Sequence, residues 1–123
     1  MRIYDTMTNQ IRDLEPKDPH KVSIYACGPT VQDVPHLGHA RTALTYDVLK
    51  RYLVWAGFEV FLVSNITDID DKIINRALEE GVSEDELAQT YANIHIEQLR
   101  NFGIKDPDER PRATQFIQQM ISI

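Results

Sequence analysis

Two short apolar runs separated by one segment of helical length constrain the fold of this chain more than any other feature. The runs are residues 22–26 and 59–63, and apolar residues recur with helical period from Gly38 to Ala56 between them. Gly57 follows, where a helix commonly ends in the left-handed conformation. A strand, a helix and a strand of these lengths form a right-handed βαβ unit. The sequence therefore predicts an α/β fold with parallel strands.

The same pattern predicts how this unit is buried. The run 59–63 is almost unbroken in apolar residues, which is typical of a parallel strand that is covered on both faces. Along the helix, one set of apolar residues lies on adjoining rows, and we expect these rows to face the core. They are Ala40, Leu44, Val48, Tyr52 and Ala56.

The remaining elements are predicted from turn and cap signals. Residues 1–20 read as a small hairpin around a Thr8–Asn9 turn, followed by a proline-containing connector. A helix is predicted over 69–80 and ends at Gly81. The sequence 83–86 is a capping box that opens a second helix, which runs to about residue 102.

The loop after the first strand concentrates residues that can bind a ligand. Cys27 ends the strand, and His36 and His39 share one face where the helix begins. Gly38 between them would allow a ligand to approach the backbone closely. The free N–H groups and the dipole of the helix start suit a phosphate. Residues 65–67 follow the second strand, so we expect them at the same edge of the sheet.

Each of these residues also has a plain structural interpretation. A single histidine at a helix start is commonly a cap or a surface residue, and a lone cysteine at a strand end is commonly a small buried hydrophobe. Three carboxylates, Asp68, Asp70 and Asp71, invite a metal, but we favour caps that stabilise the start of the following helix. His95 lies on an apolar helical row, and we expect a half-buried structural residue without a functional role.

Charge and cysteine content narrow the function classes. The formal net charge is −6, which argues against this segment supplying the main electrostatic grip on a nucleic acid. A single cysteine excludes an internal disulfide. No apolar run is long enough to cross a membrane and no signal peptide is evident, so we expect a cytoplasmic protein.

Four stretches resemble the motifs of one enzyme family. His36-Leu37-Gly38-His39 resembles the HIGH signature of class I aminoacyl-tRNA synthetases. Residues 27–30 resemble the C-G-x-T element of the cysteinyl-tRNA synthetases, residues 65–72 are similar to their N-I-T-D-I-D-D-K block, and residues 111–114 resemble a further element. The resemblance extends from Ile3 to Ile117 and is specific for the cysteinyl-tRNA synthetase family.

The resemblance implies a fold and a domain organisation. The fold is a partial Rossmann-like (HUP-type) parallel sheet with crossover helices, followed by α-helical segments. Residues 1–20 are then an N-terminal hairpin and connector, and residues 21–123 are the first half of the class I catalytic nucleotide-binding fold, truncated before the second half. The lysine-rich K-M-S-K-S signature of the class is absent. An apolar face at the end of the chain also suggests a piece of a longer protein: Phe116, Ile117, Met120, Ile121 and Ile123.

The resemblance further implies ATP-dependent activation of L-cysteine to cysteinyl adenylate, with Mg²⁺, and transfer to tRNA(Cys) through modules outside this chain. The matched residues would have these roles: His36 and His39 catalytic; His36, Gly38 and His39 binding ATP; Gly28, Thr30 and Thr67 binding the amino acid; and Cys27 binding Zn²⁺ with ligands beyond residue 123.

Other readings stay open. A cysteine ligase that acts on an amino sugar in low-molecular-weight thiol biosynthesis would use the same adenylation chemistry, and a binding module could keep the fold without the reaction. For the chain alone we expect marginal stability, no retained zinc and no catalysis.

Overall fold

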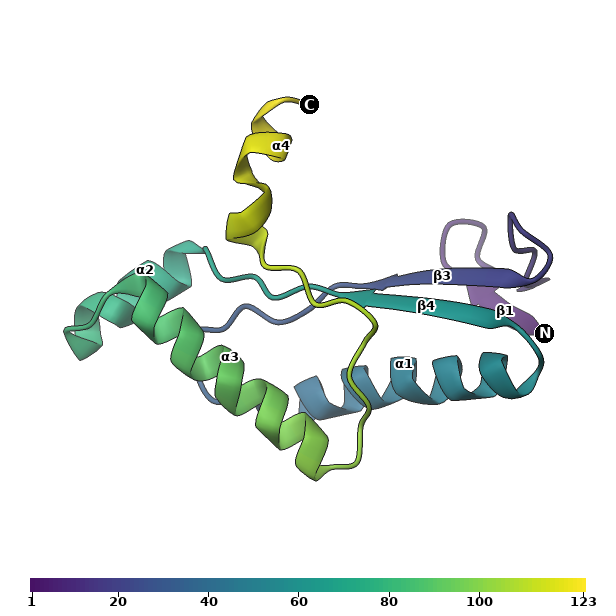
Figure 1. The fold of residues 1–123 in the computed structure, drawn as a ribbon, viewed down its shortest axis with the longest axis horizontal. Helices are drawn as coiled ribbons and strands as arrows, with labels where there is room; N and C mark the ends of the chain where they lie inside the picture. The colour runs from purple at the N-terminus through teal and green to yellow at the C-terminus, as the bar shows by residue number, and fades with distance from the viewer.

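A small parallel sheet forms the centre of the computed structural model, which describes residues 1–123. Its two strands, β3 (Lys21–Ala26) and β4 (Glu59–Ser64), pair in register from Lys21 with Glu59 to Ala26 with Ser64. The helix α1 (Leu37–Trp55) connects them and lies along one face of the sheet (Figure 1). The predicted βαβ unit and its α/β class are therefore confirmed.

A third segment extends the sheet beside β4, which the sequence did not predict. Isolated parallel bridges join Val63 with Glu109 and Ile66 with Arg112. Backbone hydrogen bonds accompany them, from the N–H of Ile66 to the carbonyl of Pro111 at 2.8 Å and from the N–H of Ala113 to the carbonyl of Ile66 at 3.0 Å. The prolines within residues 107–111 argue against a strand, so the sequence does not predict that this segment joins the sheet.

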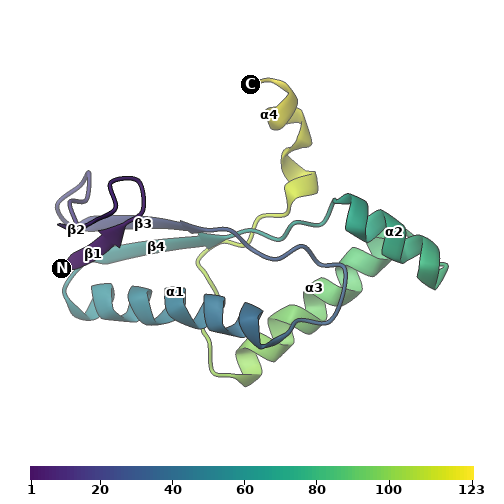
Figure 2. The same ribbon diagram turned by 180° about the vertical axis from the view of Figure 1, so that it is seen from behind.

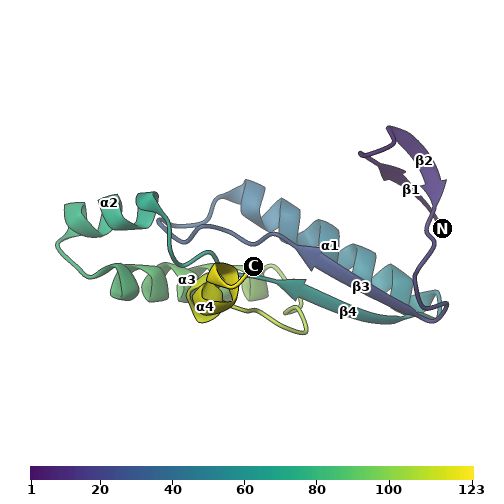
Figure 3. The ribbon, with the colours of Figure 1, turned by 90° about the horizontal axis from the view of Figure 1, so that it is seen from above.

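The N-terminal residues form the predicted hairpin. β1 (Arg2–Asp5) pairs antiparallel with β2 (Gln10–Asp13), and the turn contains Asn9 at a φ of 54°. Asparagine tolerates this left-handed conformation well. The hairpin stands apart at the end of the sheet where β3 begins (Figure 3).

Two helices follow β4 and pack against each other. α2 (Asp71–Glu80) begins two residues later than predicted because Asp70 is its N-cap, and it ends at Gly81 with a φ of 70°. α3 (Glu84–Asn101) begins at the predicted cap, Ser83. The largest buried cluster lies here and consists of Val31, Ile66, Ile73, Ala77, Leu87, Ala88 and Ala92.

The chain ends in a short turn of 3-10 helix, η1 (Ala113–Phe116), followed by α4 (Ile117–Ile121). α4 projects away from the side of the sheet opposite α1, as the views in Figures 1 and 2 agree. All its residues are exposed. None of the helices combines the length and the apolar character needed to cross a membrane.

Two predictions about burial were wrong. Leu44, Val48 and Tyr52 of α1 are 48%, 55% and 45% exposed, whereas the buried residues of this helix are Asp47 and Leu53. The row of α1 that contains Asp47 faces the sheet because Arg51 neutralises this carboxylate. Arg51 also donates to the carbonyl of Gly103, just after α3, at 2.9 Å.

The strand β4 is also covered differently from the prediction. Leu62 is 5% exposed on the face that α1 covers, while Phe61 is 46% exposed on the opposite face. Successive side chains of a strand point to opposite faces, and within residues 1–123 only one face carries a packed helix. The apolar sequence of β4 therefore predicts two buried faces, although one of them is exposed to solvent in residues 1–123.

Candidate functional site

His36 and His39 form a reciprocal cap at the start of α1. The N–H of Gly38 donates to Nδ1 of His36 at 3.1 Å, and the N–H of His36 donates to Nδ1 of His39, also at 3.1 Å. The two rings stack with their centroids 4.0 Å apart and their planes 26° apart. Two N–H groups at the helix start, which would otherwise lack partners, are thus satisfied by the two imidazoles.

This cap determines which nitrogen of each ring can donate. An Nδ1 atom that accepts a hydrogen bond carries no proton, so a neutral ring in this arrangement carries its proton on Nε2. Burial, followed by the nearby His36, lowers the pKa of His39 and so favours its neutral form. The helix start therefore presents two Nε2–H donors.

Gly38 serves this arrangement directly. A Cβ atom at residue 38 would lie 2.8 Å from Cε1 and 2.9 Å from Nδ1 of His36. The ring of His36 would have to move, and it would lose its bond to the backbone of residue 38. The glycine thus makes room for an imidazole, a reason that the sequence did not suggest.

A cavity of about 270 Å³ lies at the carboxyl ends of β3 and β4, between the sheet, α1 and α3. Cys27, Gly28 and His39 line it, and Cys27 is exposed rather than packed in the core. His36 instead borders a neighbouring hollow of about 170 Å³. The structure thus brings the thiol, the glycine and one imidazole into one cavity, with the second imidazole stacked behind.

Asn65 holds the wall of this cavity in place. Its Oδ1 accepts the N–H of Gly28 at 2.8 Å and the hydroxyl of Tyr25 at 3.1 Å, and its Nδ2 donates to Oγ1 of Thr67 at 3.2 Å. A Cβ atom on Gly28 would lie 1.5 Å from the backbone oxygen of Asn65, so no other residue fits this approach.

Thr30 and Thr67 lie beside the cavity but do not line it. They form a short parallel bridge, in which the N–H of Thr67 donates to the carbonyl of Pro29 at 2.9 Å and the N–H of Val31 to the carbonyl of Thr67 at 3.2 Å. The two predicted threonines therefore join the loop after β3 to the loop after β4.

His95 is a cavity residue that the sequence analysis assigned no role. It is 5% exposed, and its ring meets the ring of His39 edge-on with the centroids 6.0 Å apart. Burial, together with the charges of Arg110 and His39, lowers its pKa from 6.5 to about 4. Arg110, Lys105 and Asp47 also line the cavity. The one sequence signal for His95 is its place on an apolar row, which equally fits a packing residue.

No metal site is formed by the residues of this chain alone. No three His, Cys, Asp or Glu side chains come together. Asp70 caps α2 by accepting the N–H of Lys72 at 2.9 Å, as predicted. Asp68 does not cap this helix, contrary to the prediction, because its carboxylate turns toward Thr114.

Comparison with known proteins gives one consistent family. Residues 13–123 match the family described as tRNA synthetases class I (C) catalytic domain. A curated protein of Thermodesulfovibrio yellowstonii is 47% identical over 123 residues, which cover 100% of this chain and 25% of the relative. A protein of Thermococcus gammatolerans is 47% identical over 122 residues, or 99% of this chain and 26% of the relative. Both are named cysteine–tRNA ligase. The chain thus spans about a quarter of the length of these relatives.

Proposed function

The chain belongs to the class I (C) tRNA synthetase catalytic-domain family, and we propose that it forms the first part of the catalytic domain of a cysteine–tRNA ligase. In this proposal, residues 21–123 supply part of the site that joins L-cysteine to ATP, and residues 1–20 are an appended hairpin and connector. The names of the relatives favour this enzyme over a ligase that acts on an amino sugar.

The two imidazoles stabilise the charge of the reacting phosphate. A carboxylate oxygen of cysteine attacks the α-phosphorus of ATP, a P–O bond forms, and the bond to the leaving pyrophosphate breaks. The Nε2–H groups of His36 and His39 donate to phosphate oxygens as negative charge builds there, aided by the positive end of the α1 dipole. Their reciprocal cap fixes them before the substrates bind, so little reorganisation is needed.

The cavity beside His39 receives the amino acid. Gly28, held against the backbone of Asn65, and the neighbouring Cys27 lie on one wall of this cavity. Thr30 and Thr67 support this wall from behind through their bridge. His95 is neutral near pH 7 and can accept or donate a hydrogen bond inside the cavity without adding charge.

Zinc does not fit the residues of this chain by themselves, because Cys27 belongs to no group of three side chains that could hold a metal ion. The residues of this chain act without a protein-bound metal, and Mg²⁺ enters only as the counter-ion of ATP. With a formal net charge of −6, the chain is poorly suited to hold tRNA, and residues outside 1–123 would make most of that contact.

One observation carries the proposal: two Nε2–H donors at a helix start adjoin a cavity that contains an exposed thiol. The test is a titration of the 123-residue chain with a non-hydrolysable cysteinyl sulfamoyl adenylate, followed by NMR. We expect shifts at Gly28, Gly38 and the ring of His39. A titration without shifts at these residues, with or without zinc, would support a module that has lost the reaction.

The predicted inactivity of the chain alone has a separate test. Cysteine-dependent exchange of pyrophosphate into ATP should be absent with the 123-residue chain. Measurable exchange would show that this prediction is wrong.

A further inference from the structure

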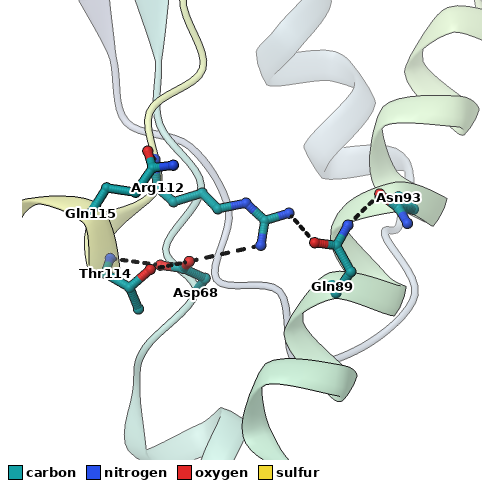
Figure 4. Close-up of polar contacts among 6 residues, drawn as sticks. All are labelled: Asp68, Gln89, Asn93, Arg112, Thr114 and Gln115. Atoms are coloured by element: carbon teal, nitrogen blue, oxygen red, sulfur yellow. Dashed lines mark hydrogen bonds and ion pairs between the residues drawn. The ribbon is translucent and has the colours of Figure 1, made fainter.

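Asp68 is buried outside the cavity and holds two distant parts of the chain together. It is 6% exposed, and its two carboxylate oxygens accept different donors of one residue. The N–H of Thr114 donates to Oδ1 at 3.0 Å, and the hydroxyl of Thr114 donates to Oδ2 at 2.7 Å (Figure 4). Nη1 of Arg112 lies 3.9 Å from Oδ2. A carboxylate that accepts such bonds is held much more strictly than an exposed one.

The cluster extends from Asp68 to α3. Nη2 of Arg112 donates to Oε1 of Gln89 at 2.8 Å, and Nε2 of Gln89 donates to Oδ1 of Asn93 at 2.8 Å (Figure 4). Three segments therefore meet at this cluster: the loop after β4, the segment 109–116 that extends the sheet, and α3.

Two of these three segments line the cavity, and the third holds a lining residue in place. The loop after β4 contains Asn65, which holds the N–H of Gly28. The segment 109–116 contains Arg110, and α3 contains His95. The polar cluster thus joins, at one point outside the cavity, two elements that line it and the loop that holds Gly28.

We propose that Asp68 is a positioning residue for the amino acid site. Its bonds to Thr114 hold the loop 65–68 against the segment 109–116, and this placement lets Asn65 fix Gly28 beside Cys27. A buried carboxylate is an expensive way to secure packing alone, since apolar residues of similar volume often stabilise a fold as well or better. The effect on substrate binding rests on the proposed function, whereas the effect on the loop does not.

Hydrogen exchange in the 123-residue chain tests the placement of the loop. In Asp68→Asn, one oxygen and the charge are lost, and we expect the N–H groups of Gly28 and Thr67 to exchange about tenfold faster. Exchange within the β1–β2 hairpin should not change, because the hairpin lies at the other end of the sheet. Unchanged exchange at Gly28 in a folded Asp68→Asn variant would overturn the proposal.

A matched pair of variants guards against a failure of Asp68→Asn to fold. Thr114→Val removes the hydroxyl and keeps the N–H donor, while Thr114→Ser keeps both. We expect faster exchange at Gly28 in the valine variant and near-normal exchange in the serine variant. Equal exchange at Gly28 in these two variants would also overturn the proposal.

Binding of the cysteinyl sulfamoyl adenylate separates this inference from the proposed function. We expect about tenfold weaker affinity in Asp68→Asn and normal affinity in Thr114→Ser. If the unaltered chain does not bind the analogue, the proposed function fails, and the exchange at Gly28 still decides whether Asp68 positions the loop. If the unaltered chain binds it and Asp68→Asn binds it equally well, the positioning role fails.

Discussion

The backbone N–H of His36 donates to Nδ1 of His39, and the two rings stack with their centroids 4.0 Å apart. One contact therefore ends the loop, starts the helix and orients two donors. It also separates the structural role of His39 from its chemical role, because the first uses Nδ1 and the second uses Nε2.

Two substitutions at His39 distinguish these roles. In His39→Asn, the amide oxygen replaces Nδ1 as the acceptor and the Nε2–H donor is lost, so stability should be kept while binding of ATP weakens. In His39→Ala both are lost, and the chain should lose about 1 kcal/mol of unfolding free energy as well. Urea unfolding followed by circular dichroism, together with an ATP titration, checks both. Equal destabilisation by the two variants would contradict the cap.

Stability should rise with pH between about 4 and 6.5. The pKa of His95 is about 4 in the folded chain against an ordinary 6.5, so the unfolded chain binds more protons in this range. The contribution is complete above pH 6.5 and is lost as the pH falls toward 4. Its slope should stay below about 1.4 kcal/mol per pH unit, because a single imidazole takes up at most one proton. In urea titrations, His95→Phe should remove most of this slope.

Gly28 should tolerate no side chain. In Gly28→Ala, the new methyl group would meet the backbone oxygen of Asn65, and the two loops would have to separate. We expect a loss of about 3 kcal/mol in the free energy of unfolding and faster exchange at Thr67. Ser23→Ala, at an exposed position of β3, is the control and should be neutral. A normal urea midpoint for Gly28→Ala would show that the loops are farther apart.

Removal of Arg51 should destabilise the chain more than removal of the charge of Asp47. Asp47 is 4% exposed, and Nε and Nη2 of Arg51 donate to it at 2.9 and 2.6 Å. In Arg51→Met the carboxylate stays buried without its cation, whereas in Asp47→Asn the arginine remains in solvent. The urea midpoint should therefore fall further in Arg51→Met. The reverse order would contradict the burial of Asp47.

The exposed apolar row of α1 should be replaceable. Leu44→Gln and Val48→Gln should each change the unfolding free energy by no more than about 0.5 kcal/mol, because both side chains face solvent in this chain. Leu53→Ala, at a residue that is 1% exposed, should cost about 2–5 kcal/mol. Urea unfolding of the three variants would reveal a buried row if Leu44→Gln were the most harmful.

Local signals in the sequence predicted the βαβ unit well. Strand length, helical period and the glycines at positions 57 and 81 depend on neighbouring residues, and both glycines have a positive φ as expected. The choice of the buried helix face depends on distant partners. Leu44 and Val48 form the more apolar row, yet the Asp47–Arg51 pair and its bond to Gly103 turn the other row inward.

The candidate site was also predicted only in part, because local signals are visible in the sequence and contacts between distant residues are not. Cys27, Gly28 and His39 follow from motifs within one loop and meet in one cavity. His95 and Arg110 reach it from far along the chain, and no local pattern marks them. The bond between Asp68 and Thr114 joins residues 46 positions apart. Because this distant partner is not visible in the local sequence, Asp68 was predicted to be a helix cap.

The distribution of buried apolar residues divides the molecule into two regions of unequal cohesion. The largest cluster joins α2 and α3 to the two loops, while α1 contributes only Leu53 to the buried apolar residues. Local opening should therefore begin on the side of α1. The imidazole pair of His36 and His39 lies at the boundary between the two regions. A ligand that contacts both His39 and the loop after Cys27 would connect the region of α1 to the region of α2 and α3. Its binding should therefore make local opening of α1 less frequent.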